Sequence, residues 1–163
     1  MKTSKNKALI FAKRNIKEMA RDPVIYVFCV AFPVAMLVLF IVINSFTNGT
    51  TPVFEFPSLL PGVITFSFSF IMLAECLLVS KDKTTSLLKR LYTSPMKKSD
   101  FVSGYFFPAA IVGIIQMIVC IFTGFILSLI VGSSYPDSQK CLLLAIEQLP
   151  SLLINIFSGI AIG

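Results

Sequence analysis

Four long apolar runs constrain this chain more than any other feature of its sequence. They cover residues 24–43, 59–79, 106–130 and 141–163. The first run has 20 residues, which as a helix would be roughly 30 Å long, about the thickness of the hydrocarbon core of a bilayer. Inside a bilayer, runs of this length satisfy their backbone polar groups by forming helices. We therefore predict an all-α integral membrane protein with four transmembrane helices.

The composition favours the same class. The chain is 56% hydrophobic and 13% charged, whereas soluble domains carry about 25% charged residues. A net charge of +6 would suggest nucleic-acid binding in a soluble protein. Here the basic residues border the apolar runs, so membrane topology and contact with the lipid bilayer explain them better, and we expect no nucleic-acid partner.

Residues 8–22 predict an amphipathic helix before the first span. Leu9, Ala12, Ile16 and Met19 recur at helical spacing, while basic residues take the opposite face. Because a span follows directly, we expect this helix to lie in the membrane interface. The alternative is an ordinary surface helix of a soluble protein.

The basic residues predict the orientation of the chain. Seven Lys and Arg residues precede the first run, none separates the first from the second, six separate the second from the third, and one follows the third. By the positive-inside rule, the N-terminus and segment 80–105 are cytoplasmic. We expect a multi-pass protein of the cell membrane, specifically a bacterial plasma membrane. The fourth run ends without a basic flank, so we expect further spans to follow it.

Segment 80–105 predicts a short amphipathic helix beside the membrane. Its apolar stripe, at positions i, i+1, i+4 and i+5, consists of Leu87, Leu88, Leu91 and Tyr92. Pro95 ends the helix, because proline disfavours helical geometry at the preceding residue. We predict that a cytoplasmic partner contacts this stripe. The alternatives are that it lies in the lipid interface or packs beneath the third span.

The sequence predicts no catalytic, cofactor-binding or metal-binding residues. It has no histidine, which excludes a Ser-His-Asp triad and histidine metal ligands. No glycine falls in a phosphate-binding loop, so any ATP is hydrolysed by another polypeptide. The cysteines are predicted to be small buried hydrophobic residues; they are Cys29, Cys76, Cys120 and Cys141. We expect no enzymatic activity and no cofactor.

Two glutamates lie inside predicted spans. A carboxylate there costs about 2.5–3.5 kcal/mol on insertion scales, which makes each a functional hypothesis. Glu75 lies within two turns of Lys81, and we expect these two to form an ion pair at the interface. Glu147 lies nearer the outer side and could face either a transport pathway or a wet outer vestibule.

The order of these elements resembles that of ABC-2 type transporter permeases. Arg21-Asp22-Pro23 and the following span, which we expect Pro33 to kink, are similar to the family's interfacial helix and first span. The cytoplasmic segment is similar to the family pattern E-R-E-x-G-T-L-E-R-L-L-x-T-P. The matching positions are Asp82, Lys83, Leu88, Arg90, Leu91 and Pro95, while Ser86, Leu87 and Lys89 depart from the pattern.

This resemblance implies the N-terminal portion of a six-span permease that pairs with a second protomer, as a homo- or heterodimer. It also implies two cytoplasmic ATPases that dock on the short helix after span two. The implied coupling residues are Leu87, Leu88, Arg90, Leu91, Tyr92 and Pro95. The short first outer loop resembles that of drug- and antibiotic-export members, which implies a drug-like or hydrophobic substrate. The alternative function is a non-transporting polytopic anchor that recruits a cytoplasmic partner through the same segment.

Overall fold

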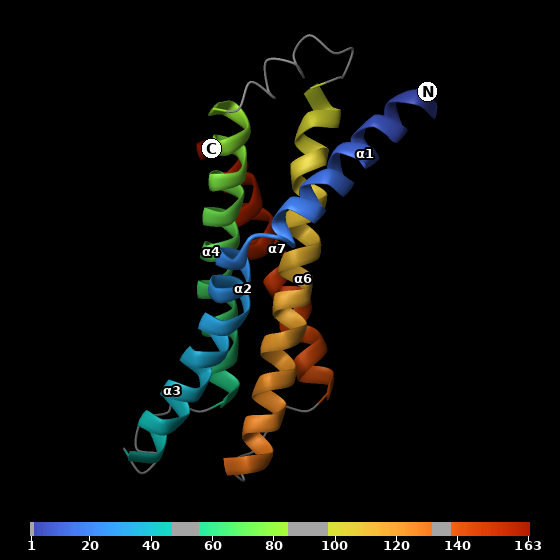
Figure 1. Ribbon diagram of the computed structural model, residues 1–163. Helices are drawn as coiled ribbons and strands as arrows, with labels where there is room; N and C mark the ends of the chain where they lie inside the picture. The colour runs from blue at the N-terminus through green and yellow to red at the C-terminus, as the bar shows by residue number, and fades with distance from the viewer. Residues whose placement is uncertain (1, 47–55, 85–97, 132–137) are drawn as a thin grey trace.

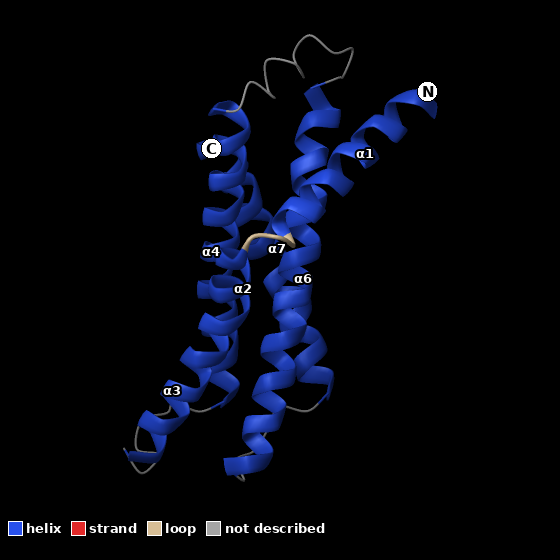
Figure 2. Ribbon diagram, viewed as in Figure 1, coloured by secondary structure: helices blue, strands red, loops and turns tan. Residues whose placement is uncertain are grey.

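A computed structural model describes residues 2–46, 56–84, 98–131 and 138–163 (Figure 1). Figure 2 shows that these residues form helices joined by a short loop, with no strand among them. The elements are α1 (Lys2–Met19), α2 (Pro23–Tyr26), the π-helix η1 (Val27–Ala31), α3 (Phe32–Phe46), α4 (Phe56–Thr84), α6 (Lys98–Val131) and α7 (Ser138–Ile162).

Within the described ranges, four helical stretches are long and apolar enough to cross a membrane. They are Val27–Phe46, Ser58–Thr84, Val102–Ile130 and Gln139–Ile162. The predicted all-α membrane class is therefore confirmed. The helices extend beyond their apolar runs, most clearly α4, which continues to Thr84, and α6, which begins at Lys98 and passes through Pro108. A helix does not need apolar residues once it leaves the hydrocarbon, and a membrane helix tolerates an internal proline.

The first span is irregular directly before Pro33. The five residues of η1 form a π-helix, and the N–H of Phe32 donates to the carbonyl of Val27. Proline has no N–H, and its ring would clash with the carbonyl four residues earlier in a regular helix. One wider turn changes the position of that carbonyl, which explains why the irregularity lies at this point.

The spans pack around α4, which lies against α3, α6 and α7. Fully buried side chains such as Ile64, Phe68 and Ile156 fill the core. Helices α4 and α7 approach closely at Gly159, where an added Cβ would lie 2.7 Å from the carbonyl oxygen of Met72. Small residues let two membrane helices approach this closely, and the gain is van der Waals contact along both backbones.

Helix α1 crosses α6 at the end of the bundle where α4 ends and α6 begins (Figure 1). Its buried face consists of Phe11, Ala12, Asn15 and Met19. The predicted apolar face was therefore partly wrong, because Ile16 is exposed and Asn15 is buried. The side-chain N–H of Asn15 donates to the carbonyl oxygen of Gly104 at 3.1 Å. This bond lets a polar side chain be buried between two helices. A prediction from the spacing of apolar residues alone does not identify such a position.

Candidate functional site

A cluster of polar side chains joins α1, α4 and α6 at this end of the bundle. We call it the polar junction; it consists of Arg14, Glu18, Lys81, Asp82 and Tyr105. Asp82, only 1% exposed, lies at its centre. The guanidinium of Arg14 donates to both oxygens of Asp82, at 2.9 and 3.4 Å. The hydroxyl of Tyr105 donates to Oδ2 of Asp82 at 2.7 Å. One buried carboxylate thus holds three helices together.

A second acid, Glu18, completes the junction nearer the surface. It accepts one bond from Arg14 at 2.8 Å and pairs with Lys81 at 2.8 Å. Lys81 therefore pairs with Glu18 of α1, and the expected pair between Glu75 and Lys81 is not formed. The reason is geometric: Asp82, next to Lys81, turns inward while Lys81 turns outward toward α1, and Glu75 lies in the packed interior.

Apolar contacts surround the polar junction. The ring of Phe11 meets that of Tyr105 edge to face, with centroids 5.1 Å apart. Gly104 leaves the space that the Phe11 ring occupies, because a Cβ at this position would overlap that ring. The guanidinium of Arg14 lies 5.9 Å from the centroid of Phe11. Helix α1 is thus held on α6 by packing and by hydrogen bonds together.

The electrostatics of the junction favour charged Arg14. Its hydrogen bond to Asp82 raises the pKa of the Arg14 guanidinium above its ordinary value, although partial burial acts in the opposite direction. Asp82 accepts its bonds from one cation and one neutral hydroxyl, so its buried oxygens are satisfied. Pairs of this kind are sensitive to the loss of one partner, which leaves an uncompensated buried charge.

The junction lies next to the predicted coupling segment. Asp82 is two residues from Thr84, the last residue of α4. The predicted coupling residues lie between α4 and α6, outside the described residues; they are Leu87, Leu88, Arg90, Leu91, Tyr92 and Pro95. The helices on either side of this segment, α4 before it and α6 after it, are therefore both bonded to α1.

Sequence reasoning found part of this junction. The family pattern identified Asp82, but Arg14, Glu18 and Tyr105 were not recognised as its partners. The spacing of Arg14 and Glu18, four residues apart, indicates a pair on one helix face. No sequence signal shows that Arg14 meets Asp82, because that contact joins positions 68 residues apart.

The two glutamates of the spans have opposite environments. Glu75 is fully buried, and neither of its carboxylate oxygens has a hydrogen-bond partner among the described residues. Its Cβ lies beside Gly159 of α7. Glu147 is exposed on α7, whereas its neighbour Gln148 is buried and accepts a bond from Thr65 at 2.9 Å. The structure therefore does not place Glu147 in the interior of this bundle.

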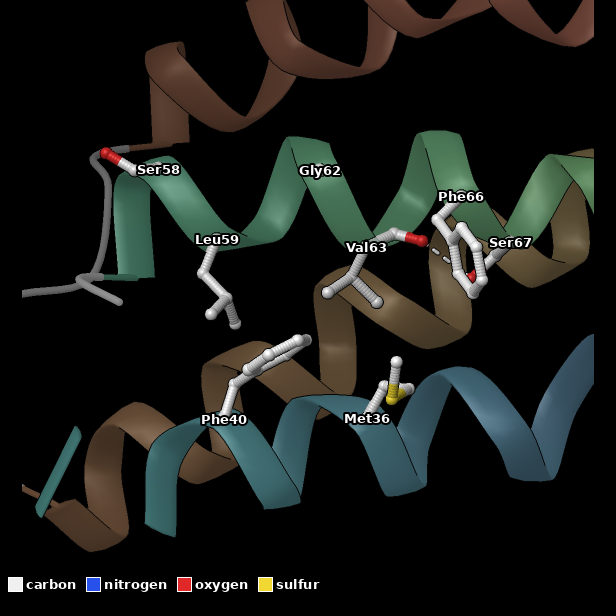
Figure 3. A pocket seen from close by; sticks show the side chains of 8 residues that line it. All are labelled: Met36, Phe40, Ser58, Leu59, Gly62, Val63, Phe66 and Ser67. Carbon is white, nitrogen blue, oxygen red and sulfur yellow. Dashed lines mark hydrogen bonds between the residues drawn. The ribbon is translucent and has the colours of Figure 1, made fainter. Parts of the chain in front are cut away.

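An apolar groove lies between α3 and the first turns of α4, away from the polar junction (Figure 3). Its volume is about 350 Å³, near the lower end of the range for small-molecule sites. Figure 3 shows Met36 and Phe40 of α3 facing Leu59 and Val63 of α4 across it. The hydroxyl of Ser67 donates to the carbonyl of Val63 at 2.7 Å. The lining therefore offers apolar contacts and few polar ones.

In the part of the chain that the structure describes, no three acidic or cysteine side chains lie together as a metal site would require. No curated protein and no solved structure matches this chain. A family model described as ABC-2 type transporter matches residues 7–161, a range that includes most of α1 and the four spans. Because the match covers nearly the whole chain, the protein belongs to the ABC-2 type transporter family.

Proposed function

We propose that this membrane component of an ABC transporter is a permease subunit that a separate cytoplasmic ATPase drives through residues 85–97. The polar junction supports this most directly. It bonds both helices that flank the segment to α1, so a force on the segment reaches three helices at once. The absence of a phosphate-binding loop in the sequence agrees with ATP hydrolysis on another polypeptide.

The proposal predicts that the apolar stripe of the coupling segment is the contact with the ATPase. Leu91→Asp or Tyr92→Asp should abolish ATP-driven transport in reconstituted vesicles while membrane insertion stays normal, because a charge placed without a partner in an apolar contact is strongly unfavourable. Thr93→Asp adds the same charge outside the stripe and is the control. Unchanged transport in both stripe variants would contradict the docking, and a chain that only anchors a partner would show no ATP-dependent transport at all.

We also propose that the N-terminus and residues 85–97 are cytoplasmic. Thirteen of the fourteen basic residues precede the first apolar run of the sequence or separate its second run, 59–79, from its third, 106–130. Helix α1 and the adjoining ends of α4 and α6 lie at the same end of the bundle (Figure 1). In a chain lacking its native cysteines, an impermeant thiol reagent added outside cells should label Asn48→Cys and spare Lys97→Cys. Labelling of Lys97→Cys but not of Asn48→Cys would show that the chain has the opposite orientation in the membrane.

We propose a drug-like or hydrophobic substrate and a pathway formed with a second protomer. The apolar groove supports the substrate class. Glu147 supports the pathway, because an exposed carboxylate within a span is poorly accommodated by lipid and is better placed toward water. Glu147→Gln should lower transport of a cationic hydrophobic dye several-fold, while the neutral neighbour variant Leu149→Ala should not. Equal transport in both variants would remove Glu147 from the pathway.

A further inference from the structure

A basic groove lies between α1 and the end of α4, on the outer side of the polar junction. It has a volume of about 700 Å³. Lys13, Lys17 and Arg21 form one wall, and Lys81 contributes to the other. Two acids, Glu18 and Asp22, also line it. The groove therefore contains more basic than acidic side chains.

The five basic side chains of the groove outnumber its two acids, so the groove carries a net positive charge. Glu18 is already bound to Arg14 and Lys81. Lys13, Lys17 and Arg21 are exposed and form no salt bridge with any residue that the structure describes. Lys13 and Lys17 are four residues apart on α1 and so lie on one side of it, opposite the buried Phe11, Asn15 and Met19. Arg21 follows the end of α1 and lines the same groove. Three positive groups thus converge on one open groove.

The level of the groove relative to the membrane indicates which kind of ligand could bind in it. Pro23, the first residue of α2 just before the first span, and Lys81, in the last turn of α4, both line it. The groove is therefore at the level where helices leave the hydrocarbon. Tyr26 is exposed and its hydroxyl donates to the carbonyl of Ala20 at 2.9 Å, in keeping with the preference of tyrosine for this level of a membrane. Lipid headgroups occupy the same level.

We propose that the basic groove binds the phosphate of an anionic phospholipid and that the bound headgroup bridges α1 to the end of α4. Lys13, Lys17 and Arg21 attract the phosphate, and the acyl chains lie along the exposed apolar side chains of Tyr26 and of the first span, which begins at Val27. Charge complementarity and membrane depth together favour a lipid over an acidic protein. This site depends on neither the substrate nor the ATPase of the proposed function.

The test compares two double variants with the same change in charge. Lys17→Gln/Arg21→Gln removes two cations of the groove, whereas Lys83→Gln/Lys140→Gln removes two exposed cations elsewhere. The purified, delipidated full chain is titrated with phosphatidylglycerol and with phosphatidylcholine, and native mass spectrometry gives the equilibrium constant for the first bound lipid. The wild type and the control should prefer phosphatidylglycerol, and the groove variant should bind it roughly tenfold or more weakly.

The same preference for phosphatidylglycerol in all three proteins would overturn the proposal. Displacement of phosphatidylglycerol by inorganic phosphate, but not by chloride of equal ionic strength, would show a site for free phosphate instead. A groove variant that keeps its lipid preference but no longer retains its ATPase would show a protein interface and would also overturn it. If the groove variant does not purify as a folded protein, the double variant Lys13→Gln/Lys17→Gln, which removes the same charge from the groove, is used in its place.

Discussion

Arg14→Met should release α1 from the bundle. The substitution leaves Asp82 buried with only the hydroxyl of Tyr105, and breaking a buried ion pair costs about 3–5 kcal/mol. Because the side chain of Arg14 is 36% exposed, we expect the lower end of that range, about 3 kcal/mol. This loss should fall on the docking of α1, since the spans have their own core. Hydrogen exchange of the α1 amides should accelerate by roughly 100-fold, while amides of α4 and α7 stay protected.

The matched control is Lys83→Met, which removes the same charge from an exposed position one residue from Asp82 and outside the basic groove. Its effect on stability should stay within about 0.5 kcal/mol. Unchanged exchange in Arg14→Met would show that the polar junction does not hold α1 in place.

A triple variant tests whether the polar junction only holds α1 in place or also transmits the motion of residues 85–97 to the spans. In Arg14→Met/Asp82→Leu/Tyr105→Phe, the buried charges and the hydroxyl are replaced by apolar groups of similar size, which is often neutral for stability. We expect this variant to restore the protection of α1. If the triple variant also shows normal ATP-driven transport, the junction only positions α1. If α1 is protected but transport is lost, the hydrogen bonds themselves carry the motion of residues 85–97 to the spans.

Gly159→Ala should separate α7 from α4. The new methyl group would lie 2.7 Å from the carbonyl oxygen of Met72 and 3.0 Å from the Cβ of Glu75. Neither atom can turn away as the end of a flexible side chain could, so one helix must shift. Overpacking of this kind costs about 1–3 kcal/mol, and Gly159→Leu should cost more. The measurement is the thermal unfolding midpoint of the purified protein in detergent micelles.

Gly62→Ala is the matched control within the same bundle. An added Cβ there meets nothing within 4 Å, and alanine is the better helix former. The control should therefore unfold at the same temperature as the wild type or higher. If Gly159→Ala behaves like this control, the close contact between α4 and α7 is not required for stability.

The fold class could be predicted because it depends on quantities that the sequence contains directly. A span such as Val27–Phe46 is recognised by its length and its lack of charge. Inside a bilayer, such a run satisfies its backbone polar groups by forming a helix. The prediction for Glu75 failed for a different reason. Sequence distance placed Lys81 within reach along the helix, but Lys81 lies nearer to Glu18 of another element.

By itself, the sequence determined that this chain is a helical membrane protein of the ABC-2 type and at which ends its charges gather. Hydropathy and charge act on each segment separately, so they can be read along the chain. Only the tertiary structure decided that Arg14 meets Asp82, that Asn15 is buried against Gly104, and that Lys17 is left to line an open groove. These facts depend on how α1 crosses α6, where the Phe11 ring fills the space left by Gly104 and Asn15 bonds to the same residue, and no local pattern encodes such contacts.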